Sequence, residues 1–196
     1  LTFLTLGIYL ENPGDNLIQE SAFQVVSIAT TTGFLTSNYS NWPLFVPILL
    51  LFTAFIGACA GSTGGGIKVI RTLVLAKQSA GEITKLIHPN AVISIKLGKK
   101  AVSSRVAESV WGFFSIYVIV FIILFMFLLA QGNDFITSFS AVGATLNNLG
   151  PGLGDVSNDY QSLNDYSKIG LSIAMILGRL EIFTLLVLFT PAFWKK

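Results

Sequence analysis

Charged side chains are scarce in this sequence. Asp, Glu, Lys and Arg make up 11% of its 196 residues, against roughly 25% in soluble globular domains, which argues against a soluble protein. Cysteine and histidine occur once each. A single cysteine excludes an internal disulfide. One cysteine and one histidine are also too few for a zinc centre, which needs three or four protein ligands. The one histidine, His88, has no spaced carboxylate or nucleophile beside it, so we expect neither an enzyme nor a covalently bound cofactor.

Long hydrophobic stretches are what the sequence has instead. Residues 109–130 carry no formal charge and, at about 1.5 Å per residue, would span the roughly 30 Å hydrocarbon core of a membrane as one helix. Residues 44–69 and 169–194 are also mostly apolar. Residues 1–10 are apolar but too few to cross, and they have no signal-peptide features, so we expect the end of a truncated helix. The sequence predicts an all-α, multi-pass integral membrane protein.

The charges that are present divide by sign along the chain. Eight of the twelve basic residues are Lys68, Arg71, Lys77, Lys85, Lys96, Lys99, Lys100 and Arg105. By the positive-inside rule this basic segment is cytoplasmic. Seven of the ten acids then face outward, namely Glu11, Asp15, Glu20, Asp134, Asp155, Asp159 and Asp165. The predicted topology has residues 109–130 running outward and both other spans running inward.

Two shorter segments must then begin and end outside. Residues 16–30 and 135–147 are too short to cross as helices, and each is preceded by or opens on a capping residue, Asn16 and Asp134. We interpret them as re-entrant helices followed by non-helical return segments at 30–34 and 147–151. Irregular backbone at membrane depth survives where it lines a water-filled path. The alternative is a pair of extracellular loops with ordinary surface helices.

The return segments have the chemistry of a cation filter. Backbone carbonyls can replace the hydration shell of a monovalent cation, and the glycines Gly33 and Gly150 permit the dihedrals that aim successive carbonyls at one axis. The C-terminus of each re-entrant helix would add roughly half a negative charge. The outward acids either concentrate cations at the entrance or form a solvated rim without a role.

A glycine cluster interrupts the span at residues 44–69. Four glycines lie within residues 61–66, and each costs about 1 kcal/mol relative to alanine in a helix, so this segment must break the helix. It lacks the Gly-Lys-Ser/Thr of a phosphate-binding loop. Arg179 lies within the last apolar span, where ionisable groups face a pore or a partner. We therefore predict that Arg179 faces the pore, the alternative being a buried ion pair.

Four motifs follow one another along the chain: TTGF at 31–34, GACAGSTGGGIK at 57–68, NNLGPGLG at 147–154 and GRLE at 178–181. In this order they resemble the third filter, the broken third inner helix, the last filter and the last inner helix of the Trk/Ktr/HKT potassium-uptake superfamily, most closely its bacterial Trk type. The resemblance covers essentially the whole chain. It implies a protein of the bacterial cytoplasmic membrane built from helix, re-entrant helix, filter strand and helix repeats of the potassium-channel type.

The resemblance also implies the arrangement of the chain. The third repeat would occupy residues 1–76, with its pore helix and filter at 16–39 and its broken inner helix at 44–76. A basic cytoplasmic connector would follow at 77–105, and its alternating residues 92–102 predict a small β-hairpin. The fourth repeat would occupy 106–196, with an outer helix at 106–130, a pore helix and filter at 134–154 and an inner helix at 167–194.

The resemblance assigns roles to particular residues. Filter carbonyls that bind potassium would be those of Thr30, Thr31, Thr32, Gly33, Asn147, Asn148, Leu149 and Gly150. The gate beneath the filter would comprise Gly57, Gly61, Ser62, Thr63, Gly64, Gly65, Gly66 and Arg179. Implied partners are the N-terminal half of the same subunit with repeats one and two, a second subunit in a homodimer, the lipid bilayer and a cytosolic nucleotide-binding ring, but no nucleic acid. The basic segment would dock that ring, or serve only as a topology signal.

The predicted function is potassium uptake through a channel-like pore, with potassium as the bound ion. Inside-negative potential favours each entering monovalent cation by about 2.3 kcal/mol per 100 mV, so uptake needs no further chemistry. Two alternatives remain open, a non-conducting assembly subunit of the membrane and an ion-coupled carrier.

Overall fold

The computed structural model is mostly helical, as the sequence predicts. It describes residues 17–36, 39, 42–43, 45–59, 61–62, 64–91, 95–98, 100–180, 187 and 191–194. The elements are α2 (Leu17–Ala29), α3 (Phe45–Ile56), α4 (Val69–Ile87), β1 (Lys96–Leu97), β2 (Lys100–Ala101), α5 (Ser104–Ala130), α6 (Phe135–Leu146), the 3-10 helix η2 (Gly154–Val156), α7 (Asp165–Arg179) and α9 (Pro191–Trp194). The truncated helix predicted at residues 1–10, and the cap predicted at Asn16, lie outside the described residues.

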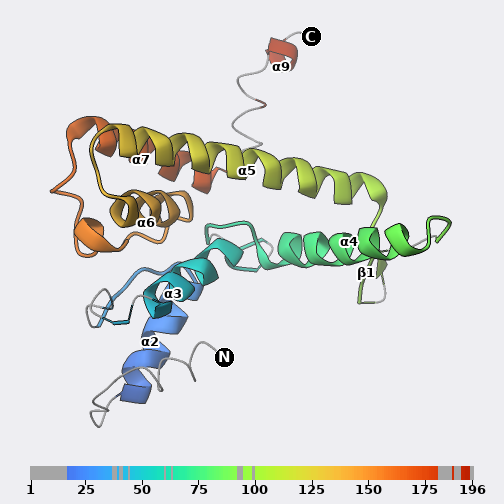
Figure 1. Ribbon diagram of the computed structural model, residues 1–196, viewed down its shortest axis with the longest axis horizontal. Helices are drawn as coiled ribbons and strands as arrows, with labels where there is room; N and C mark the ends of the chain where they lie inside the picture. The colour runs from blue at the N-terminus through green and yellow to red at the C-terminus, as the bar shows by residue number, and fades with distance from the viewer. Residues whose placement is uncertain are drawn as a thin grey trace.

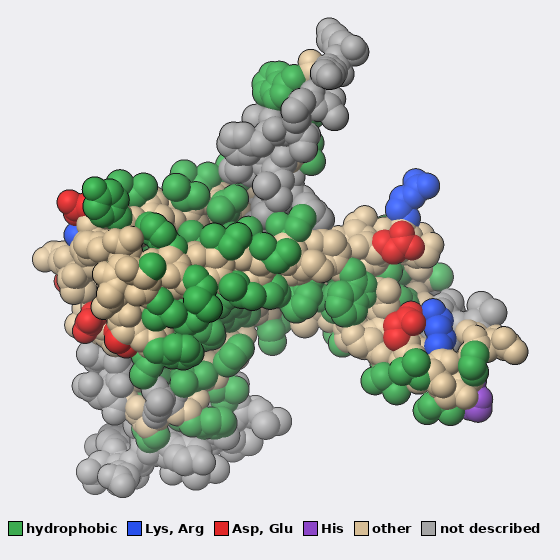
Figure 2. Space-filling view, turned by 45° about the horizontal axis from the view of Figure 1, so that its top comes forward, with side chains coloured by type: hydrophobic (Ala, Val, Ile, Leu, Met, Phe, Trp, Pro, Cys, Tyr) green, Lys and Arg blue, Asp and Glu red, His purple; other side chains and the backbone are tan. Residues whose placement is uncertain are grey.

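Helix α5 is the longest element, and it contains the predicted span at 109–130. An 18-residue stretch within its 27 residues has a mean hydropathy of 3.0, and α5 is the one helix in the described part of the chain long and apolar enough to cross a membrane. The Ser103 hydroxyl caps it by accepting a hydrogen bond from the Val106 amide. Figure 2 shows hydrophobic side chains across the middle of the visible face and charged side chains toward its two ends, as expected of a membrane protein.

The two short helices α2 and α6 follow the prediction for residues 16–30 and 135–147. They have 13 and 12 residues, about 20 and 18 Å in length, so neither would cross a hydrocarbon core. Helix α6 begins where predicted, because the Asp134 carboxylate accepts hydrogen bonds from the amides of Ile136 (3.0 Å) and Thr137 (3.2 Å). It packs against α3, α5 and α7, and almost all of its residues from Thr137 onward are buried (Figure 1).

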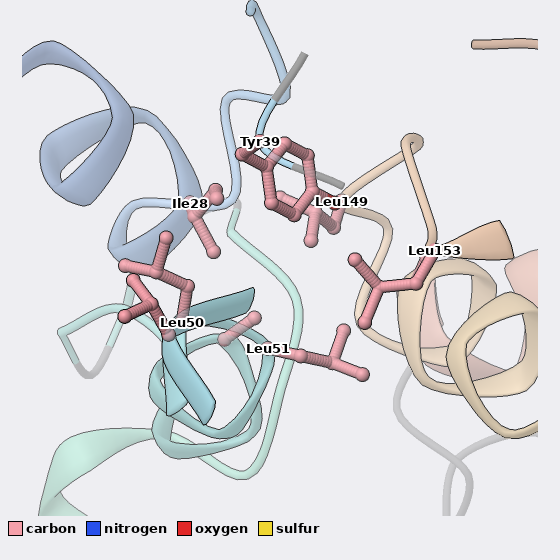
Figure 3. Close-up of a cluster of buried hydrophobic side chains, with 9 residues drawn as sticks. Ile28, Tyr39, Leu50, Leu51, Leu149 and Leu153 are labelled. Carbon is pink, nitrogen blue, oxygen red and sulfur yellow. The ribbon is translucent and has the colours of Figure 1, made fainter. Parts of the chain in front are cut away.

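One hydrophobic cluster joins the two halves of the chain. Ile28, Tyr39, Leu50 and Leu51 come from the first half, and Leu149 and Leu153 from the second. Figure 3 shows Tyr39 beside Leu149, with Leu51 directed toward Leu153. Since burying such a side chain contributes about 1.5–3 kcal/mol, this cluster holds the segments after α2 and α6 together.

The connector contains the predicted hairpin. Strands β1 and β2 pair antiparallel, with Lys96 opposite Ala101 and Leu97 opposite Lys100, and Gly98 in the turn has φ +60°. Helix α4 continues to Ile87, so it runs past residue 76, where the sequence predicts the end of the inner helix. Residues 92–94 and 99 lie outside the described residues.

The last inner helix differs from its prediction as one helix over 167–194. Helix α7 ends at Arg179, with Leu180 as its C-cap. Helix α9 begins at Pro191, and residues 181–186 and 188–190 lie outside the described residues. A Cβ on Gly178 would lie 2.0 Å from the Leu146 carbonyl oxygen, so the last turn of α7 abuts the end of α6. Arg179 therefore stands at a helix C-terminus, where the helix dipole favours a cation, and not in mid-helix.

Candidate functional site

The two return segments have the same backbone hydrogen bonds. In each, the first three amides after the helix turn back to carbonyls of its last turns. After α2, the amides of Thr30, Thr31 and Thr32 donate to the carbonyls of Val26 (3.0 Å), Ile28 (3.1 Å) and Ser27 (2.8 Å). After α6, the amides of Asn147, Asn148 and Leu149 donate to the carbonyls of Gly143 (3.2 Å), Thr145 (3.0 Å) and Ala144 (2.8 Å). These segments are therefore two copies of one local structure, consistent with an internal repeat.

Left-handed residues end both helices. Thr31 has φ +55° and Asn148 φ +53°, and two residues later Gly33 has φ +82° and Gly150 φ +103°. A left-handed residue after the last helical turn redirects the chain. For threonine this conformation is uncommon and costs about 1 kcal/mol or more, so surrounding contacts must fix it. The sequence predicted the glycines but gave no sign that Thr31 and Asn148 adopt this conformation.

The two return segments meet at Gly33. A Cβ on Gly33 would lie 2.0 Å from the Leu149 carbonyl oxygen and 3.3 Å from Pro151, so the backbones touch. An open hollow of about 490 Å³ lies at this junction and includes Gly33, Phe34, Gly150 and Pro151 in its lining. The structure thus brings together the two predicted filter segments, with Gly33 and Gly150 at one hollow.

The glycine-rich loop lies against both return segments. The Gly65 amide donates to the Thr31 hydroxyl (3.3 Å), and a Cβ on Gly65 would lie 1.7 Å from the Asn147 carbonyl oxygen. A Cβ on Gly64 would come within 3.2 Å of the same Thr31 hydroxyl. Any larger residue at 65 would displace the loop, which gives the glycine a packing reason as well as a helix-breaking one.

Backbone hydrogen bonds join the two ends of the glycine-rich loop, which connects α3 to α4. The Ile67 amide donates to the Phe55 carbonyl (3.0 Å), and the Val69 amide donates to that of Ala58 (3.3 Å). The first bond satisfies a carbonyl at the end of α3 that an uninterrupted helix would have satisfied itself. Gly57 and Gly66, at φ +71° and +81°, pack together at the base, whereas Gly61 and Ser62 are exposed. Thr63, also predicted for the gate, lies outside the described residues.

Lys68 is a site residue that the sequence analysis assigned only to the cytoplasmic basic segment. Its side chain folds back onto the loop, where Nζ donates to the carbonyls of Ser62 (2.8 Å) and Gly64 (2.5 Å), and the residue is only 8% exposed. The sequence signal for this role was a lysine two residues after a glycine cluster, at the end of an apolar stretch. Buried ammonium groups require such acceptors.

Arg179 and Lys68 line one pocket. This pocket of about 170 Å³ also includes Gly64, Tyr117 and Gly178 in its lining. The two positive charges therefore border the same space as the glycine-rich loop. Glu181, the acid two residues further along, lies outside the described residues, and the pore-facing role of Arg179 stays a prediction.

The predicted filter segments offer backbone carbonyls and threonine hydroxyls as oxygen ligands. Within the described residues there is no group of three or more His, Cys, Asp or Glu side chains placed to hold a metal ion. A cation at this site would therefore bind to carbonyl and hydroxyl oxygens, such as those of Thr30 and Thr32, whose hydroxyls lie 2.8 Å apart.

A mostly helical chain with an apolar 27-residue helix and two matching short helices defines a helical membrane protein with an internal repeat. The family model described as TrkH, cation transport protein, matches residues 12–196, and the chain belongs to this family. The members of this family are inner-membrane, multi-pass transporters and not enzymes.

Named relatives agree with this family. The chain is 57% identical over 179 residues to the Trk system potassium uptake protein TrkH of Escherichia coli, covering 91% of this chain and 37% of the relative. It is 44% identical to the E. coli protein TrkG over 176 residues, 90% of this chain and 36% of that protein. The crystal structure of the potassium transporter TrkH from Vibrio parahaemolyticus matches with a TM-score of 0.90 at 52% identity, covering 99% of this chain and 42% of that one. The chain thus spans about two fifths of the length of these relatives.

Proposed function

We propose that this chain forms part of a channel-like pore for potassium uptake. Residues 1–76 would be the third repeat and 106–196 the fourth, joined by the connector at 77–105. The filter strands of repeats one and two would come from the N-terminal half of the same subunit. The names of the relatives, potassium uptake proteins and a potassium transporter, support potassium as the substrate.

The observation that carries the proposal is the contact between the two return segments. Their matching backbones meet at Gly33 and Leu149, directly after the C-termini of α2 and α6, which end at Ala29 and Leu146. Each helix end contributes about half a negative charge, and the carbonyls that follow are the ligands a dehydrated monovalent cation needs. The filter would be formed by the carbonyls of residues 30–33 and 147–150.

The glycine-rich loop supplies a gate in this proposal. It touches Thr31 and the Asn147 carbonyl from one side of the filter, and Lys68 and Arg179 border the pocket beside it. A cation leaving the filter would meet the loop and two positive charges. Opening would require the loop to move away from the filter.

The remaining partners follow from the family resemblance. A homodimer of subunits and a cytosolic nucleotide-binding ring would complete the assembly, the ring docking on the basic connector. The name "Trk system" of the relatives supports an assembly of more than one component.

Flux measurements test the proposal. The full-length subunit, with its N-terminal half, is reconstituted into liposomes, and uptake of potassium, rubidium, sodium and lithium is compared. A channel-like pore gives downhill, potassium-preferring flux. Absence of flux from a correctly folded protein would identify an assembly subunit, and obligatory exchange or coupling to a second ion would identify a carrier.

A further inference from the structure

Three tyrosines donate hydrogen bonds to the segment that follows α6. The Tyr160 hydroxyl donates to the Gly150 carbonyl (2.6 Å), and the Tyr39 hydroxyl donates to the Gly152 carbonyl (2.8 Å). The Tyr117 hydroxyl donates to Oδ1 of Asn147 (2.8 Å). The sequence contains five tyrosines in all, and three of them donate hydrogen bonds to this one segment.

The three tyrosines come from three different parts of the fold. Tyr117 belongs to α5, and Tyr160 to the outer loop between η2 and α7. Tyr39 lies between α2 and α3 in the first half of the chain, where it is 1% exposed and packs beside Leu149 (Figure 3). The return segment of the second half is therefore held from its own outer helix, from its own loop and from the other repeat.

Tyr160 bonds to a glycine whose Cβ side is open. A Cβ on Gly33 would collide with the Leu149 carbonyl, whereas a Cβ on Gly150 would meet nothing within 4 Å. Gly150 also has φ +103°, a conformation open to glycine, whose backbone rotates more freely than that of any other residue. The close backbone approach seen at Gly33 has no counterpart on the Cβ side of Gly150, and the hydroxyl of Tyr160 provides a fixed point for the Gly150 peptide group.

The bond fixes the direction of the carbonyl without using it up. A carbonyl oxygen has two lone pairs, so one can accept from Tyr160 while the other stays available. Asn147 is held similarly at the inner end, where its side-chain amide also donates to the Gly143 carbonyl (2.8 Å). Its own backbone carbonyl faces Gly65 of the loop.

We propose that Tyr160 is a positioning residue that determines cation selectivity by fixing the direction of the Gly150 carbonyl. Tyr39 fixes the carbonyl of Gly152, two residues further along the chain. This inference rests on the proposed function of the return segments as a potassium filter. Discrimination between potassium and sodium depends on the number and placement of coordinating carbonyls. If the Gly150 peptide were free to rotate, its carbonyl could move to coordinate sodium, the smaller ion, more readily.

The test compares Tyr160→Phe with Tyr166→Phe in the full-length subunit in liposomes. Tyr166 is 71% exposed and serves as the matched control. We expect Tyr160→Phe to lower the potassium-over-sodium permeability ratio about 2- to 10-fold, the range that the net strength of one hydrogen bond corresponds to. Tyr166→Phe should keep the wild-type ratio. Incorporating p-aminophenylalanine at position 160, which restores a donor at the same place, should recover selectivity.

A lowered melting temperature with an unchanged permeability ratio in Tyr160→Phe would show a purely structural tyrosine and overturn the inference. If that variant does not assemble, Tyr39→Phe takes its place, and an unchanged ratio there overturns the inference equally. A wild type that does not prefer potassium would instead contradict the proposed function. A selective wild type with an equally selective Tyr160→Phe would contradict only the positioning role.

Discussion

Gly33 and Leu149 are in backbone contact across the two repeats: a Cβ on Gly33 would lie 2.0 Å from the Leu149 carbonyl oxygen. The glycine is thus required twice, once for its φ of +82° and once for this approach. Its counterpart Gly150 meets only the first requirement, because a Cβ on Gly150 would meet nothing within 4 Å.

This asymmetry predicts different effects for the same substitution. Gly33→Ser should reduce the potassium-over-sodium permeability ratio strongly, because the new side chain pushes the Leu149 carbonyl out of place. Gly150→Ser adds only the strain of a serine at positive φ, about 1–2 kcal/mol, and should reduce the ratio less. Permeability ratios of the full-length variants in liposomes measure both. Equal ratios in the two variants would contradict the contact as the cause.

Removing the glycine-rich loop should increase flux. Deleting residues 61–65 takes away the segment whose Gly65 contacts Thr31 and Asn147, while the bonds from Ile67 to Phe55 and from Val69 to Ala58 lie outside the deletion. Potassium flux per inserted subunit is the measurement. Gly98→Ala, in the hairpin turn with open space around it, is the control and should conduct as wild type. A folded deletion variant that conducts no faster would exclude a gating role.

Arg179→Ala should also increase flux. A fixed positive charge 4 to 8 Å from the path opposes a cation by about 2–4 kcal/mol at an effective dielectric constant near 20, and about 1.4 kcal/mol is tenfold in rate. Arg179→Lys keeps the charge and should stay close to wild type. If Arg179 completes a buried ion pair instead, the alanine variant should lose stability by about 3–5 kcal/mol without any gain in flux.

Lys68 should contribute through both its charge and its two hydrogen bonds. Lys68→Met removes the charge and the bonds to Ser62 and Gly64, so the loop loosens and flux should rise. Lys68→Gln retains a donor without the charge, and flux intermediate between wild type and Lys68→Met is expected. Identical flux in all three folded proteins would remove Lys68 from the gate.

The cap at Asp134 should make α6 sensitive to acid. Burial acts to raise the pKa of Asp134, but hydrogen bonds from Thr137 and Ile136 outweigh it and leave the pKa below its usual value of 3.8. A carboxyl with a lowered folded-state pKa stabilises the fold above its unfolded pKa and loses that contribution as the pH falls through the folded pKa.

Asp134→Ala should therefore destabilise the protein by about 1 kcal/mol at neutral pH, whereas Asp134→Asn should retain most of the cap. Thermal unfolding in detergent across the acidic range measures both. The difference in stability between the wild type and Asp134→Ala should shrink as the pH falls below 3.8. A difference that does not change with pH would mean that the ionised carboxylate is not the stabilising form.

Local features of the site were predictable from the sequence. The Asp134 cap, the two short helices and the break at the glycine cluster each depend on residues within a few positions of one another, so composition and spacing reveal them. The end of α7 at Arg179 was not predictable, because the apolar pattern continues to residue 194 and the contact of Gly178 with Leu146 is between helices.

By itself the sequence determined that this chain is helical, apolar and built from two similar units, because hydrophobic length, glycine content and helix caps are local properties. Only the tertiary structure decided which atoms meet. It set the approach of Gly33 to Leu149, the folding of Lys68 onto the loop, and the bond from Tyr39 to Gly152. Those contacts join residues far apart along the chain, and burial in a shared core fixes them, which no spacing in the sequence encodes.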